Sequence, residues 1–110
     1  MIAIRAAAES HTGYVRSNNE DLAVTSSDLA AIADGMGGHL GGEVAARTAI
    51  EELVEAFQRD RTAAGLEAAV RKANREIWRR SRADRKLRGM GTTLTAAALL
   101  PGGGRGQARL

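Results

Sequence analysis

A short polar segment near the start of the chain combines a cation with two adjacent carboxylates. Arg16 is followed by Asn19, Glu20 and Asp21 in the order Arg-x-x-Asn-Glu-Asp. The planar guanidinium of arginine suits phosphate because it donates two parallel, charge-assisted hydrogen bonds. Adjacent carboxylates favour a countercharge, and a divalent metal ion is a strong one. A phosphate- and metal-binding role explains the segment, and so does a plain polar surface loop.

A further carboxylate follows an apolar run. Asp34 comes directly after residues 29–33 and precedes Gly35, the first of several glycines that continue to Gly42. An aspartate at the end of a strand is a good ligand for a hard divalent cation. Glycine beside it lets a backbone oxygen approach an ion without a side chain in the way. Asp-Gly is also a common turn pair, so simple turn chemistry is the alternative.

The glycines do not have the spacing of a nucleotide-binding loop. A P-loop requires Gly-x-x-x-x-Gly-Lys-Ser/Thr, and no lysine directly follows these glycines. A dinucleotide fingerprint requires Gly-x-Gly-x-x-Gly, and Leu40 stands where the third glycine after Gly35 and Gly37 is needed. Both classes of nucleotide site are therefore excluded.

The elements that must position these residues form an α+β pattern. Two short apolar runs flank Ser26-Ser27-Asp28 and predict a β-hairpin. Helical spacing of apolar residues predicts helices over 43–57, with Glu43 at the dipole-favoured start, and over 64–87, ended by Gly89. Strands joined by tight turns indicate an antiparallel sheet with helices covering one face. The expected strands are residues 2–8, 22–25, 29–33, 93–100 and 105–110.

Positive charge gathers in the second expected helix. The formal net charge is +3, and residues 71–88 hold nine cations against only Glu76 and Asp84: Arg71, Lys72, Arg75, Arg79, Arg80, Arg82, Arg85, Lys86 and Arg88. A basic stripe binds nucleic acid or acidic partners in some proteins. Apolar residues at helical spacing on another face predict a solvated basic face here, with no specific nucleic-acid binding. A basic binding module acting through residues 64–88 is the alternative.

Composition places the chain among cytoplasmic globular proteins. Of its 110 residues, 44% are hydrophobic and 26% are charged, as in ordinary soluble domains. The sequence contains no cysteine, which excludes disulfides and thiolate metal sites. Residues 1–5 are too short and too soon charged for a signal peptide. No apolar run approaches the length of a membrane span, so we expect a cytoplasmic protein.

Together these motifs resemble the bacterial branch of the metal-dependent (type 2C, PPM) Ser/Thr protein phosphatases. The resemblance runs from about Thr12 to Leu100. It is carried by four segments in order: Arg16-Ser-Asn-Asn19-Glu20-Asp21, Ala33-Asp34-Gly35-Met36-Gly37-Gly38-His39, Gly42-Glu43 and Gly89-Met90-Gly91-Thr92-Thr93.

The resemblance implies a layered α-β-β-α sandwich, two antiparallel sheets flanked by helices. It implies that residues 1–110 are the N-terminal portion of a single, truncated catalytic domain. It also implies dephosphorylation of phosphoserine and phosphothreonine proteins, the products of Ser/Thr kinases, by a water activated by two Mn²⁺ or Mg²⁺ ions. We expect this chain alone to be inactive, because the family's later half supplies further metal aspartates. A non-catalytic, phosphatase-like fragment is the alternative.

The resemblance also implies roles for individual residues. Asp34 matches the metal-bridging aspartate, and Gly35 matches the residue that offers its backbone carbonyl to a metal. Glu20 and Asp21 match carboxylates that hold metal-bound waters, and Arg16 matches the phosphate-binding arginine. Two features depart from the family. Some members have a histidine directly after the Asp-Gly pair, where this chain has Met36, and residues 85–88 lack the aspartate of a third metal site.

Overall fold

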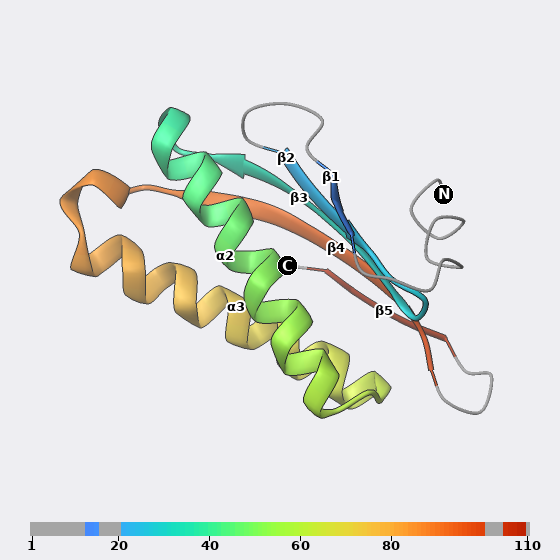
Figure 1. Ribbon diagram of the computed structural model, residues 1–110. Helices are drawn as coiled ribbons and strands as arrows, with labels where there is room; N and C mark the ends of the chain where they lie inside the picture. Colours follow the sequence, from blue (N-terminus) through green and yellow to red (C-terminus); the bar gives the residue numbers. More distant parts are fainter. Residues whose placement is uncertain (1–12, 16–20, 101–104, 110) are drawn as a thin grey trace.

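The structure, a computed structural model, describes residues 13–15, 21–100 and 105–109, and Figure 1 shows the course of the chain. Within these ranges, no helix is long and apolar enough to span a bilayer. The elements in chain order are β1 (Gly13–Val15), β2 (Asp21–Thr25), β3 (Leu29–Met36), α2 (Gly38–Arg59), α3 (Ala63–Ala83), the short 3₁₀ helix η1 (Arg85–Leu87), β4 (Gly91–Leu99) and β5 (Arg105–Arg109).

The strands form one five-stranded antiparallel sheet in the order β1-β2-β3-β4-β5. A tight turn joins β2 to β3, in which the Ser26 backbone N–H donates to the Leu29 carbonyl at 2.8 Å. The chain then leaves the sheet through α2 and α3 and returns as β4 beside β3 (Figure 1). This arrangement confirms the predicted hairpin and the predicted α+β class.

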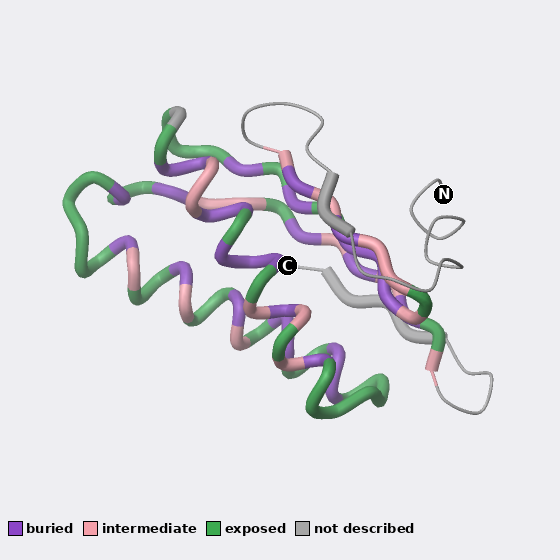
Figure 2. Tube along the Cα trace, viewed as in Figure 1, coloured by how far each residue is buried: buried purple, intermediate pink, exposed green. Residues whose placement is uncertain are grey.

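Both helices pack on the same face of the sheet (Figure 2). The hydrophobic core lies between this face and the two helices. In β3 the residues that face the helices, such as Ala31 and Ala33, are buried, while Ile32 between them is exposed. This alternation follows from the two-residue period of a strand, which sends successive side chains to opposite faces. The fully buried Ile50, Leu53 and Phe57 of α2 therefore pack onto a sheet face made mostly of alanine and leucine.

The first helix begins five residues earlier than the sequence predicted. It starts at Gly38, so Glu43 lies in its second turn instead of at its positively polarised end. The residue before the helix, Gly37, has a φ of +109°, a left-handed conformation that glycine adopts without strain. Most of the glycine-rich segment therefore lies in β3 and α2 and not in a loop. Glycine has low helix propensity, so the sequence did not predict a helix here.

The second helix ends earlier than predicted. Its start is capped by Thr62, whose hydroxyl accepts from the Gly65 backbone N–H at 2.9 Å. It ends at Ala83, and Asp84 then caps η1 by accepting from the Lys86 backbone N–H at 2.9 Å. Gly89, with a φ of +77°, turns the chain from η1 towards β4 and does not end α3.

The remaining differences concern the first strand and the end of β3. The predicted strand over 2–8 lies outside the described residues, and β1 forms over Gly13–Val15, where we expected no strand. The predicted strands near the C-terminus are confirmed as β4 and β5. β3 continues through Asp34 to Met36, so this aspartate lies inside a strand.

Candidate metal centre

Two aspartates and a threonine lie side by side across three strands. Asp21 of β2 pairs in register with Asp34 of β3, which pairs in turn with Thr93 of β4. Directly opposite residues share a face of the sheet, with Cβ atoms about 5 Å apart. Since Ala33 and Gly35 face α2, Asp34 and its two partners face away from the helices. Asp34 and Thr93 are exposed and Asp21 is half-buried.

Thr93 fixes the backbone at Asp34. The Asp34 backbone N–H donates to the Thr93 Oγ1 at 3.2 Å. The neighbouring Thr92 hydroxyl donates to the Thr93 carbonyl at 2.7 Å. Sequence reasoning quoted these threonines only as part of a motif and assigned them no role. The two-residue period of a strand could have indicated a role, because it places one of two adjacent threonines on the same face of the sheet as the aspartate.

Gly35 allows α2 to approach β3 closely. A Cβ added at Gly35 would lie 1.9 Å from the Gly42 carbonyl oxygen, and one added at Gly37 would lie 2.6 Å from the Met90 Cα. These distances leave no room for a side chain. Because Asp34 and Gly35 lie within β3, the turn alternative for this pair is wrong. The role of the Gly35 carbonyl as a metal ligand stays a prediction.

The donor chemistry at this end of the sheet fits a hard divalent cation. Carboxylate oxygens of Asp21 and Asp34 are the ligand type that Mg²⁺ and Mn²⁺ prefer. Across the described residues, however, no group of three or more His, Cys, Asp or Glu side chains could hold an ion. The described residues thus offer part of a coordination shell. Arg16 and Glu20, the other predicted site residues, lie outside the described ranges, and their roles stay predictions.

An exposed apolar side chain lies near Asp34 on the same face of the sheet. Met36, two residues beyond Asp34 in β3, is 52% exposed. A thioether has no proton to donate, so Met36 cannot protonate a leaving group as a histidine at its position could.

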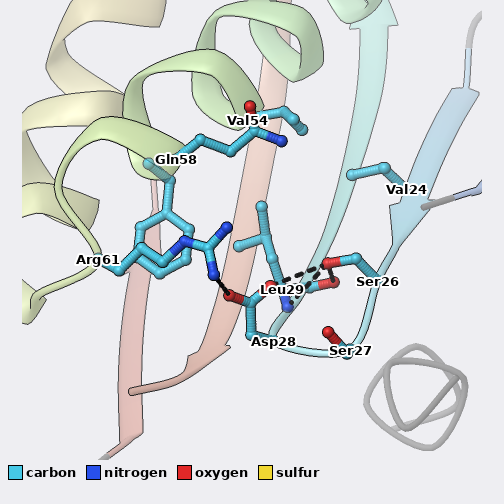
Figure 3. A pocket seen from close by; sticks show the side chains of 9 residues that line it. Val24, Ser26, Ser27, Asp28, Leu29, Val54, Gln58 and Arg61 are labelled. Carbon is cyan, nitrogen blue, oxygen red and sulfur yellow. Dashed lines mark hydrogen bonds and ion pairs between the residues drawn. The ribbon is translucent and has the colours of Figure 1, made fainter. Parts of the chain in front are cut away.

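A small cavity lies at the opposite end of the β2–β3 hairpin. Its volume is about 110 Å³, and Figure 3 shows Arg61 reaching towards Asp28 at its edge, with an Nη1–Oδ2 distance of 3.0 Å. The Ser26 hydroxyl donates to the Asp28 Oδ1 at 3.1 Å. Asp28 is thus bonded to two other polar groups of this cavity, those of Arg61 and Ser26. Its lining residues are Val24, Ser26, Ser27, Asp28, Leu29, Val54, Phe57, Gln58 and Arg61.

The basic face of α3 is solvated, as predicted. Every cation between 71 and 88 is exposed or half-buried, while the apolar stripe of the same helix is buried: Leu66, Ala69, Val70, Ala73 and Ile77. Glu76 lies among these cations. Hydrogen bonds from Arg79 first, and from Arg80, lower the pKa of Glu76 from 4.5 to about 2 against a smaller opposing effect of burial.

Comparison with known sequences identifies related proteins. The sequence profile of protein phosphatase 2C matches residues 11–106. The serine/threonine protein phosphatase PstP of Mycobacterium tuberculosis is 44% identical over 98 residues, which cover 86% of this chain and 19% of PstP. The serine/threonine phosphatase stp of Listeria monocytogenes is 35% identical over 99 residues, which cover 79% of this chain and 39% of the relative. The chain therefore spans well under half the length of these relatives.

Solved structures share the fold. The crystal structure of PstP/Ppp from M. tuberculosis superposes with a TM-score of 0.74 at 40% identity, covering 93% of this chain and 44% of that one. MsPP, a PPM Ser-Thr phosphatase from Mycobacterium smegmatis in complex with cacodylate, gives 0.70 at 34% identity, covering 90% and 43%. The PstP catalytic domain in complex with 2 manganese ions gives 0.66 at 43% identity, covering 82% and 40%. The described sheet and helices therefore form part of a PPM phosphatase fold.

Proposed function

The chain belongs to the protein phosphatase 2C family, and we propose that it contributes the phosphate-binding and part of the metal-binding residues of an enzyme that dephosphorylates phosphoserine and phosphothreonine in proteins. The observation that carries the proposal is the register that sets Asp34 directly opposite Asp21 on one exposed face. Carboxylate oxygens are the ligand type that a hard divalent cation prefers. Two carboxylates held side by side by the strand register therefore favour binding of such an ion.

The proposed metal is Mn²⁺ or Mg²⁺. Asp34 would hold it through a carboxylate oxygen and Gly35 through its backbone carbonyl, while Glu20 and Asp21 would hold bound waters. The relative PstP, whose catalytic domain was solved in complex with 2 manganese ions, supports this choice. When bound, such ions act as Lewis acids and make water a stronger nucleophile at neutral pH.

The chain's own residues position the reacting groups. Arg16 would bind the phosphoryl oxygens through its guanidinium and offset the negative charge that develops on them. Thr93 keeps the backbone of Asp34 in place by accepting its N–H. The proposed mechanism needs no covalent nucleophile, and the absence of cysteine from this sequence is consistent with it.

The proposed substrates are proteins phosphorylated by Ser/Thr kinases, and the proposed location is the cytoplasm. We also propose that this chain alone is inactive. Within the described ranges the carboxylates form no complete metal-binding group, and a two-metal centre needs several of them.

The test is a chimera in which residues 11–106 replace the matching part of the PstP catalytic domain. We expect Mn²⁺-dependent hydrolysis of p-nitrophenyl phosphate by the chimera and none by the 110-residue chain alone. Asp34→Ala in the chimera should lower turnover about 100-fold or more. Asp28→Ala, which removes an aspartate at the other end of the hairpin, is the matched control and should retain turnover. Near-unchanged turnover in Asp34→Ala would contradict the proposal.

A further inference from the structure

The outward face of α3 carries an exposed aromatic ring among arginines. Trp78 is 59% exposed, and the Arg82 guanidinium carbon lies 5.7 Å from the centroid of its ring. Arg75, Arg79 and Ala83 complete the lining of an open hollow of about 510 Å³. We name these five residues the Trp78 patch.

The charges of the Trp78 patch are only partly neutralised. Glu76 accepts hydrogen bonds from the Arg79 Nη2 at 2.6 Å and from the Arg80 Nε at 3.1 Å, so its charge is already used. Arg75 and Arg82 form no ion pair with any residue in the described ranges. Each guanidinium carries five N–H donors in a planar fork that fits a carboxylate. The patch therefore offers unused donors around an apolar ring.

The fold does not need Trp78 in this position. The apolar stripe that holds α3 on α2 lies on another face of the helix and is buried without it. Tryptophan and arginine are enriched among the residues that dominate binding energy at protein interfaces. A partner that binds over the patch needs carboxylates to pair with its arginines, because burying an unpaired arginine costs several kcal/mol. The complementary surface is therefore acidic.

We propose that the Trp78 patch is a docking site for an acidic peptide segment of a partner protein. Carboxylates of the segment accept hydrogen bonds from Arg75 and Arg82, and one apolar side chain among them lies on the indole ring. The proposal does not depend on catalytic activity, so it can fail or hold separately from the proposed function.

A peptide fits the patch better than nucleic acid or a membrane does. Proteins that bind single-stranded nucleic acid stack successive bases on several aromatic rings. Trp78 is the sole tryptophan of the sequence, and α3 has no other aromatic residue, so the patch offers only one ring. Membrane-surface helices present several large apolar side chains. The other exposed large hydrophobic residues of the described ranges lie on β3, α2 and β4: Ile32, Met36, Leu40 and Leu99.

The single tryptophan makes the test direct, because its fluorescence reports only on this patch. We would titrate the purified chain with a synthetic peptide of alternating Asp and Glu around one central Leu, at low and physiological salt. The expected result is a saturable change in Trp78 emission whose dissociation constant rises with salt. The same peptide with Lys in place of Asp and Glu should give no change.

Charge reversal of the unpaired arginines identifies the site. With a fluorescently labelled peptide and anisotropy as the readout, Arg75→Glu and Arg82→Glu should each weaken binding about tenfold or more. Arg47→Glu, an exposed arginine of α2 with the same change of charge, is the control and should bind nearly as the unchanged chain does. Circular dichroism checks that each variant keeps its helices.

Three results would overturn the proposal. The first is an absence of saturable binding of the acidic peptide at low salt. The second is an equal loss of affinity in Arg47→Glu and Arg82→Glu, which would indicate nonspecific attraction. The third is saturation of the Trp78 signal by single-stranded DNA or by phosphatidylserine vesicles but not by the peptide, which would assign the patch to nucleic acid or to a membrane instead.

Discussion

The aspartates at the two ends of the β2–β3 hairpin have different neighbours. At the turn, Asp28 binds Arg61 and the Ser26 hydroxyl, and its backbone carbonyl accepts from the Leu99 N–H at 2.9 Å. At the open end, Asp34 stands opposite another carboxylate, that of Asp21. The same pair of strands thus has one end where opposite charges meet and one where like charges meet.

This difference separates residues that hold the fold from residues that hold a ligand. The turn end joins the sheet to the α2–α3 connection through the ion pair between Arg61 and Asp28 (Figure 3). The open end places two carboxylates side by side on the sheet face turned away from the helices, where they can serve as metal ligands.

The largest expected effect is steric and lies at the open end. Gly35→Ala places a Cβ against the Gly42 carbonyl, so α2 must move away from β3, and we expect a loss of about 3 kcal/mol in unfolding free energy. Gly91→Ala on the adjacent strand is the control, because its Cβ would meet Met36 at an ordinary 3.6 Å. Urea denaturation followed by circular dichroism measures both. Equal stability of the two variants would show that the helix does not depend on this close approach.

A smaller effect is expected at the turn end. Asp28→Ala removes the Arg61 ion pair and the Ser26 hydrogen bond, and we expect a loss of about 1 kcal/mol, since the arginine is half exposed. Arg59→Ala breaks the exposed pair with Glu55 and is the control, with an expected change below about 0.5 kcal/mol. If Asp28→Ala proved more stable than the unchanged chain, the turn end would not stabilise the fold as described.

The smallest expected effect is a pH dependence at Glu76, which pairs with Arg79 and Arg80 on α3. The pKa of Glu76 is lowered in the folded state, so its stabilising contribution is present above pH 4.5 and is lost as the pH falls towards about 2. Glu76→Gln should therefore reduce stability at neutral pH by less than about 1 kcal/mol, and the difference should shrink below pH 4.5. Thermal unfolding over this pH range measures it, with Glu67→Gln on the same helix as control. A difference that grows on acidification would contradict the assigned cause.

Much of the fold could be predicted from local pattern. The two short apolar runs on either side of Ser26-Ser27-Asp28 predicted the hairpin, and helical spacing from Leu66 to Ile77 predicted the buried stripe of α3. The start of α2 could not be predicted. Gly38, Gly41 and Gly42 have low helix propensity. Two of them lie close to distant parts of the chain, Gly42 to Gly35 of β3 and Gly41 to Met90, and such tertiary contacts cannot be predicted from local pattern.

The sequence suggested which residues belong to the candidate site, and their metal- and phosphate-binding roles stay predictions; it did not suggest how they are arranged. The motif around Asp34 indicated a metal ligand, whereas its pairing with Asp21 depends on a strand register that the sequence alone did not specify. The bond between the Thr93 hydroxyl and the Asp34 backbone joins positions 59 residues apart, a separation at which no local pattern operates.

The most direct test of the contrast between the two ends is Mn²⁺ binding to the purified chain, measured by electron paramagnetic resonance of the free ion. We expect weak binding, with a dissociation constant on the order of 1 mM, because the chain supplies only part of a coordination shell. Asp34→Asn should weaken this binding about tenfold, whereas Asp28→Asn should leave it unchanged. Equal Mn²⁺ affinity in the Asp34→Asn and unchanged chains would contradict the assignment of the open end of the hairpin as the metal-binding end.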